Sequence, residues 1–398
     1  MRKYFKWVGY SIAAILAFGI LYLVNLFFMK PLSLDHYLGK EVVLEFLDSP
    51  EALTYMGIVD RFNWITRHQS KISINGLEDL EEDLIEAKEV KSMLLAFNDT
   101  SLTKQQKITK KIAVFDLNNT IAEAEKFPYH NFPLNQLGGI HLNLVEFMTD
   151  IHPIRNVQEA EAYIDRLNLF NDSFKGTLEI LDVQREAGIY PPKFVFDHVI
   201  RQLTEFLNYE KEKNPLREVF VRKIKEVDVD SETSQDLVSK LDLAMEDSVK
   251  PGFGLLLGFI YETLPQADVH DGVWSLPNGD DFYALRLKVY TTTNYSAEEI
   301  HNIGLSEVQR LANRMQEIFG QLGYGDNLNV GEMMNELNAD PKFLYADTPD
   351  RKQVVVKDYA DIVEGTWGAA ESSFHKMPES KVEVRAVPEY SEQNHAGG

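Results

Sequence analysis

Residues 274–283 read WSLPNGDDFY, and residues 291–299 follow shortly with TTTNYSAEE. Asn278-Gly279 is typical of a tight turn, because glycine takes a positive φ angle without steric cost. Ser296 and Glu299 have the spacing of a capping box, in which each side chain accepts a hydrogen bond from the other residue's amide. Two helix starts so close together predict a helical fold around this stretch.

The acidic and aromatic residues of the first stretch have two interpretations. In the structural one, Asp280 or Asp281 caps the helix that starts here, and Trp274 and Tyr283 pack beneath it. In the functional one, Asp280 and Tyr283 belong to a cleft wall and offer polar contacts to a substrate. Paired carboxylates are common in so acidic a chain, so the structural interpretation is favoured.

The helical pattern extends over most of the chain. Ser49 followed by Pro50 is a typical N-cap and first helical residue. After Ser296, apolar residues recur at three- and four-residue spacing as far as Leu322, and this stripe predicts core packing. Further helices are predicted at 77–97, 104–126, 140–148, 156–170, 177–186, 193–209, 331–337 and 353–372.

Residues 381–388, KVEVRAVP, alternate strictly and are rich in β-branched side chains, which predicts a strand. Pro388 places it at a sheet edge or at a strand end. A single strand is not stable, and few other segments offer a partner. We therefore expect this strand to pair with sequence that is absent from the chain.

Residues 7–28, WVGYSIAAILAFGILYLVNLFF, carry no charge. A helix of this length is roughly 33 Å long, enough to cross the hydrocarbon core of a membrane. Arg2, Lys3 and Lys6 precede it, so the positive-inside rule predicts a cytoplasmic N-terminus and a bulk that lies outside the cytoplasm. A cleaved signal peptide is the alternative, although no A-x-A pattern ends the segment.

The composition excludes several classes of function. The formal net charge of −22 repels phosphate backbones, so nucleic acid binding is not expected. The absence of cysteine excludes disulfides, thiolate nucleophiles and cysteine-ligated zinc. No H-E-x-x-H or G-x-S-x-G motif occurs, and no two of the ten histidines are three to five residues apart. We expect no metal site and no catalytic residue in this chain.

The residues quoted first also carry a family resemblance. Residues 274–283, 291–293 and 296–308 resemble the bacterial family catalogued as domain of unknown function 885, with weaker support from 340–343 and 384–389. The similarity covers roughly residues 40–390. It implies a mostly helical relative of zinc peptidases, with a metal motif similar to H-E-x-x-P-G-H-H beyond Pro388.

None of those metal ligands occurs in this sequence. Zinc is thus implied for a full-length relative only. In related zinc peptidases an edge strand aligns an extended peptide, and the resemblance makes Val384 and Arg385 candidates for that contact, beside Asp280 and Tyr283.

The expected protein is a membrane-anchored, periplasm-facing metallopeptidase-like hydrolase, present here as a fragment without its zinc-binding segment. The alternative is a non-catalytic helical envelope module that binds peptides or proteins. The expected parts are a single-pass inner-membrane anchor at 1–30, a helical domain at 31–390, and a polar tail at 391–398 where the chain is truncated. The sequence does not indicate the substrate or the oligomeric state.

Overall fold

The computed structural model describes residues 2–267, 271–323, 329–380 and 382–387. The chain divides into two compact units, residues 1–296 and residues 297–398. The described residues are mainly helical, as predicted from the sequence, and contain no strand.

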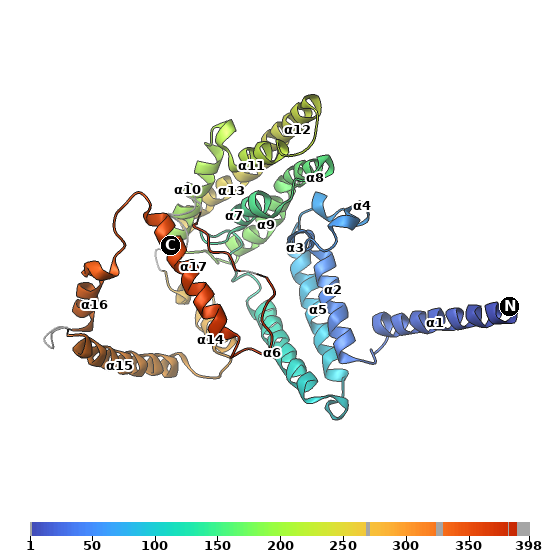
Figure 1. Ribbon diagram of the computed structural model, residues 1–398, viewed down its shortest axis with the longest axis horizontal. Coiled ribbons are helices and arrows are strands. Elements are labelled where there is room, and N and C mark those ends of the chain that lie inside the picture. Colours follow the sequence, from blue (N-terminus) through green and yellow to red (C-terminus); the bar gives the residue numbers. More distant parts are fainter. Residues whose placement is uncertain (1, 268–270, 324–328, 381, 388–398) are drawn as a thin grey trace. The chain divides into compact units, whose positions relative to one another are not determined.

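Unit 1 is built from helices joined by short turns (Figure 1). Its α-helices are α1 (Arg2–Phe28), α2 (Leu34–Asp48), α3 (Pro50–Met56), α4 (Asn63–Thr66), α5 (Leu77–Ala96), α6 (Lys104–Lys126), α7 (Ile140–Glu146), α8 (Val157–Asn168), α9 (Phe170–Glu186), α10 (Lys193–Leu207), α11 (Pro215–Ile224), α12 (Ser231–Ala244), α13 (Lys250–Thr263) and α14 (Gly279–Thr291). Its 3₁₀ turns are η1 (Asp60–Phe62), η2 (His68–Ser70), η3 (Asp99–Ser101), η5 (Lys211–Lys213), η7 (Leu264–Gln266) and η8 (Val273–Ser275), and η4 (Phe147–Ile151) and η6 (Met245–Val249) are π-helical.

The main core of unit 1 lies among α8, α9, α10 and α13. Phe206 and Phe253 stack there with ring centroids 3.8 Å apart. Gly252 allows the close approach of α9, because a Cβ built on it would lie 2.7 Å from the ring of Phe174. A second, smaller core joins α2, α5 and α6 around Tyr37 and Phe97. Unit 1 therefore contains two clusters of buried apolar side chains.

Two of the sequence signals for helix starts are confirmed. The hydroxyl of Ser49 accepts from the amide of Ala52 at 3.1 Å, and α3 begins at Pro50. The side chain of Asn156 accepts from the amide of Glu159 at 2.9 Å and opens α8. These caps satisfy amides that have no partner within the helix, which fixes where each helix begins.

Unit 2 contains α15 (Ala297–Leu322), α16 (Val330–Ala339), the 3₁₀ turn η9 (Pro341–Phe343) and α17 (Arg351–Ala370). Phe319 and Met333 are its buried apolar side chains among the described residues. The apolar stripe of α15 was predicted to pack in a core, and this was wrong. Val308 is 67% exposed and Leu311 49% exposed, because the described part of unit 2 offers them no packing partner.

The predicted transmembrane anchor over 7–28 is also wrong. Among the described residues, no helix combines the length and the apolar composition that a membrane crossing requires. Freedom from charge, the basis of the prediction, is a weaker condition than apolarity. Tyr22 and Asn25 are uncharged, yet they hydrogen bond to His36 and to the backbone of Lys30 and Leu32.

The predicted strand over 381–388 is absent as well. Residues 382–387 have no regular secondary structure, and 381 and 388 lie outside the described residues. Alternation favours an extended chain, but a strand requires a neighbouring chain to hydrogen bond with. The described residues supply no such neighbour, so the pattern forms no ladder. The predicted tail at 391–398 also lies outside the described residues.

Candidate functional site

The 272–283 segment, which holds the sequence motif, is a tightly closed turn that leads into α14. The amides of Ser275, Leu276 and Gly279 donate to backbone carbonyls three residues earlier, at 2.9 to 3.0 Å. Asn278 has a left-handed φ of 53°. A Cβ built on Gly279 would lie 1.9 Å from the carbonyl oxygen of Val273. Only glycine fits at position 279 in this backbone.

The segment is fixed against α6 and the loop that follows it. Nε2 of His130 donates to the carbonyl oxygen of Pro277 at 2.8 Å. The rings of Phe127 and His130 lie 5.3 and 4.8 Å from the buried ring of Phe282. Arg286, one turn further on, pairs with Glu123 at 2.9 Å. These contacts hold the turn in place from both of its ends.

Several other side chains of the segment are exposed to solvent. Trp274 is 69% exposed, and Asp280, Asp281 and Tyr283 are exposed too. The predicted packing of Trp274 and Tyr283 beneath the helix was wrong, because Phe282 takes that position. The side chain of Asn278, the N-cap residue of α14, makes no capping hydrogen bond. The carboxylates of Asp280 and Asp281 lie in its first turn, where the helix dipole favours negative charge.

The other two candidates lie in unit 2. Val384 is half-buried, and Arg385 is exposed and pairs with Glu383 at 2.5 Å. Asp280 and Tyr283 lie three residues apart in α14 of unit 1. Each unit thus contains two of the four candidates, and their role in binding stays a prediction.

The buried histidines of unit 1 do not converge on a common point. Nε2 of His141 bonds to Gln202 at 3.0 Å, and Nε2 of His152 donates to the carbonyl oxygen of Glu159 at 3.0 Å. Burial lowers the pKa of His141 to about 4 and that of His152 to about 3, so both stay neutral. Among the described residues, no three His, Asp or Glu side chains are grouped closely enough to hold a metal ion. The zinc implied by the resemblance does not fit these residues.

Sequence reasoning missed a polar cluster around Arg166, which is fully buried. Its guanidinium donates to Nδ1 of His152 at 2.6 Å, to Thr54 at 2.7 Å, and to the carbonyl oxygens of Lys71 at 2.8 Å and His68 at 2.9 Å. Burial lowers its pKa to about 10, so it stays charged at neutral pH. The sequence signal for this cluster was an arginine on the apolar stripe of α8, three residues after Tyr163. The cluster joins distant segments and is structural.

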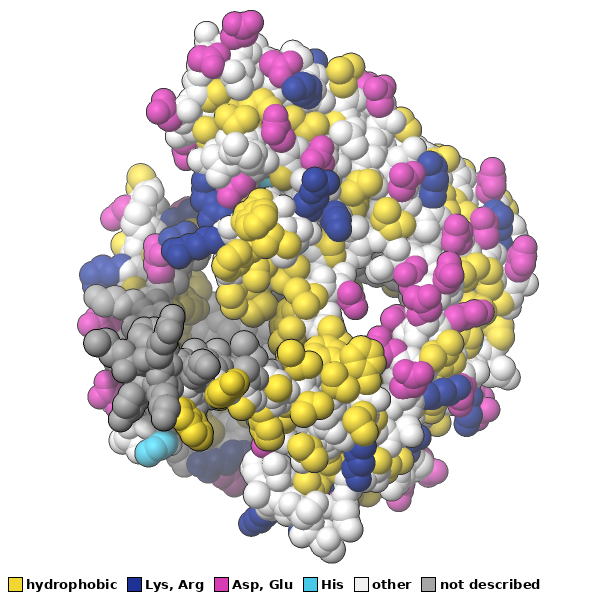
Figure 2. Space-filling model, turned by 90° about the vertical axis from the view of Figure 1, so that its right-hand side faces the viewer, with side chains coloured by type: hydrophobic (Ala, Val, Ile, Leu, Met, Phe, Trp, Pro, Cys, Tyr) yellow, Lys and Arg dark blue, Asp and Glu magenta, His cyan; other side chains and the backbone are white. Residues whose placement is uncertain are grey.

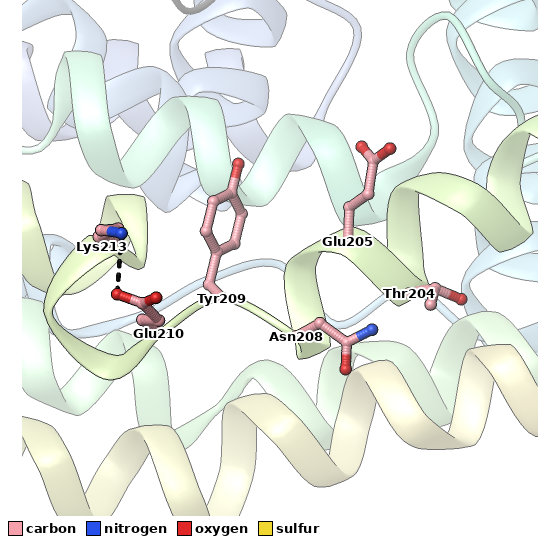
Figure 3. A pocket seen from close by; sticks show the side chains of 6 residues that line it. All are labelled: Thr204, Glu205, Asn208, Tyr209, Glu210 and Lys213. Carbon is pink, nitrogen blue, oxygen red and sulfur yellow. Dashed lines mark ion pairs between the residues drawn. The ribbon is translucent and has the colours of Figure 1, made fainter.

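A shallow depression of about 420 Å³ lies at the end of α10 (Figure 3). Its side chains come from one stretch of chain, residues 204–213. Tyr209 and Glu205 point to one side and Asn208 to the other, while Glu210 pairs with Lys213 at 2.8 Å. Because these groups do not converge, the depression is a weaker candidate than the 272–283 segment.

Fold and site together define a mainly helical protein that presents a rigid, exposed turn. The chain belongs to the family described as "Bacterial protein of unknown function (DUF885)", which matches residues 50–398. The resemblance drawn from residues 274–308 is thereby confirmed at the level of the family.

One solved structure, described as that of "the putative lipoprotein from Colwellia psychrerythraea", is similar over 89% of this chain, with 22% identity and a TM-score of 0.78. The chain spans 63% of the length of that protein. This likeness shows a shared fold. No curated protein is significantly similar to the chain.

Proposed function

We propose that this chain is the helical, substrate-contacting part of a bacterial envelope hydrolase of the peptidase type. In this proposal the exposed side chains of the 272–283 segment contact a peptide. One observation supports the proposal most. The backbone of this segment requires glycine at position 279, and it holds the side chains of Trp274, Asp280 and Tyr283 exposed. A rigid backbone lowers the entropy lost on binding.

The chemistry of the segment favours an extended peptide with cationic or aromatic side chains. The carboxylate of Asp280 can accept hydrogen bonds from an ammonium group or from peptide amides. The rings of Trp274 and Tyr283 offer faces on which cations and other rings stack. The envelope part of the proposal is supported by the description of the solved relative as a lipoprotein. Because zinc does not fit the described residues, no step of this proposal runs through it.

Peptide binding by the full chain tests the proposal. A fluorescein-labelled decapeptide of alternating lysine and alanine is titrated and its anisotropy is measured. Asp280→Asn is expected to weaken binding about tenfold, since a hydrogen bond between charged groups contributes roughly 1.5–3 kcal/mol. Asp165→Asn, an equal change of charge at an exposed position of α8, is the control. Equal affinities of the two variants, or no binding by the natural chain, would refute the proposal.

The non-catalytic envelope module remains the second candidate, and one observation favours it. The buried His141 and His152 make hydrogen bonds within the fold, so they are not placed to act on a substrate. Peptide integrity after incubation with the chain and added zinc separates the two candidates. We expect no hydrolysis by this chain alone, and a larger family member that cleaves the same peptide would favour the hydrolase.

A further inference from the structure

A second surface of unit 1 is apolar where a water-facing loop is normally polar. The 55–67 loop runs from the end of α3 through η1 and α4. All of its large apolar side chains except the half-buried Val59 are exposed, Trp64 to 77%. They are Tyr55, Met56, Ile58, Phe62, Trp64 and Ile65. Exposed apolar groups that gather in one short segment mark an interaction site more often than scattered ones do.

Three polar side chains of this loop, those of Asp60, Asn63 and Thr66, point inward instead. Asp60 pairs with Arg155 at 2.5 Å and with His68 at 3.4 Å. The side chain of Asn63 accepts from the amide of Gln69 at 3.1 Å, and Thr66 bonds to Nδ1 of His68 at 2.7 Å. These inward contacts fix the backbone of the loop, and its apolar side chains are left exposed.

Both ends of the loop are held in left-handed backbone conformations. Gly57 has a φ of 63° and closes α3, with its amide donating to the carbonyl of Leu53 at 3.1 Å. Arg67 has a φ of 49°, which is uncommon for a residue with a side chain. The carbonyl oxygen of the next residue, His68, accepts from the buried Arg166. The Arg166 cluster therefore holds the C-terminal end of the loop in place.

The charge of the loop is opposite to that of the chain. Residues 55–71 contain Arg61, Arg67 and Lys71 and a single acid, Asp60, whereas the whole chain carries −22. Arg61, Arg67 and Lys71 are exposed. The acid is already paired with Arg155. Hydrophobic side chains gather on the face that holds α4, with Lys and Arg side chains beside them (Figure 2).

We propose that the 55–67 loop docks on the surface of an anionic phospholipid bilayer. Trp64, Tyr55 and Phe62 suit the boundary between headgroups and acyl chains, where aromatic side chains are enriched. Arg61 and Arg67 pair with lipid phosphates, and each such cation strengthens binding to an anionic surface. The loop lies in the interface plane and does not cross the bilayer. This inference is independent of the proposed peptide site.

The absence of cysteine gives the experiment a local readout. Ile58→Cys is labelled with the environment-sensitive dye NBD in the full chain, which reports the loop whatever else contacts the lipid. Vesicles of phosphatidylcholine with 30% phosphatidylglycerol are expected to shift the NBD emission to the blue and to increase its intensity. Vesicles of phosphatidylcholine alone are expected to act much more weakly. Leu305→Cys, an exposed apolar position in α15, is the matched label and is expected to show no shift.

Two variants in the Ile58→Cys background separate the apolar and charged contributions. Trp64→Ser with Ile65→Ser is expected to raise the lipid concentration needed for half of the signal at least about tenfold. Arg61→Gln with Arg67→Gln is expected to raise it about fivefold per arginine at low salt and to remove the preference for phosphatidylglycerol.

Two outcomes would overturn the proposal. In one, NBD at Ile58 does not respond to anionic vesicles even though the chain sediments with them, so the loop stays in water. In the other, the emission shifts without lipid as protein concentration rises, so the loop binds a second copy of the chain.

Discussion

Helices α8 and α15 are both amphipathic, yet only α8 buries its apolar stripe. Tyr163 and Leu167 of α8 are fully buried, whereas Val308 and Leu311 of α15 are exposed. The difference lies in the surroundings, since α8 packs on α9, α12 and η2. Periodicity defines which face of a helix is apolar, and burial depends on whether another element covers that face.

The largest expected effect comes from Arg166 on α8. Arg166→Ala leaves several buried acceptors without a donor, and we expect a loss of about 3–5 kcal/mol in the free energy of unfolding of unit 1. Arg166→Lys should recover only part of it, because an ammonium group cannot match the planar guanidinium. Urea unfolding followed by circular dichroism measures both.

The control for this prediction is Arg310→Ala on α15. Arg310 is exposed and pairs with Glu307 at 2.7 Å, so its removal should leave the unfolding midpoint unchanged. Equal midpoints for Arg166→Ala and the natural chain would mean that the cluster does not stabilise unit 1.

The turn before α14 is expected to be the next most sensitive. Gly279→Ala forces a Cβ against the carbonyl of Val273 and should cost about 1–3 kcal/mol. Gly254→Ala in α13 is the matched change, because a Cβ there meets no atom within 4 Å. It should stabilise the helix by roughly 0.5–1 kcal/mol. If both changes had the same sign, the close approach of Gly279 to Val273 would not be what restricts position 279.

Acid should weaken unit 1 through its buried histidines. His152 is neutral when folded, with a pKa lowered to about 3, but takes up a proton near pH 6.5 when unfolded. The unfolded state then binds more protons, so stability falls as pH drops from about 6.5 toward 3, by about 1.4 kcal/mol per pH unit. His152→Gln should flatten the pH dependence of urea unfolding over this range. An unchanged slope would show that His152 is not buried as described.

The smallest effect is expected on the exposed stripe of α15. Leu311→Ala should change the free energy of unfolding of unit 2 by less than about 0.5 kcal/mol, because the side chain is already half in water. The same change at the buried Leu167 should cost about 2–5 kcal/mol in unit 1. A large loss at Leu311 would show that something covers α15 in solution.

Local signals were predictable from sequence, and long-range ones were not. Ser49 and Asn156 mark the starts of α3 and α8, because capping depends only on nearby atoms. The strand over 381–388 failed because a ladder needs a distant partner. In the candidate site, the turn at Asn278-Gly279 could be predicted from the sequence. The exposure of Trp274 was not, because it is Phe282 that packs on His130, a residue far away in the sequence.

The hydrogen bonds of Arg166 also constrain the order in which the chain can fold. They connect α8 to Pro50, Thr54, His68 and Lys71, which precede it by about a hundred residues. During synthesis from the N-terminus, that early segment lacks the buried guanidinium that joins these acceptors until α8 has left the ribosome. Contacts of such long sequence separation form slowly. We expect nascent chains arrested before residue 166 to be cut by protease between 50 and 72, and longer ones to be protected there.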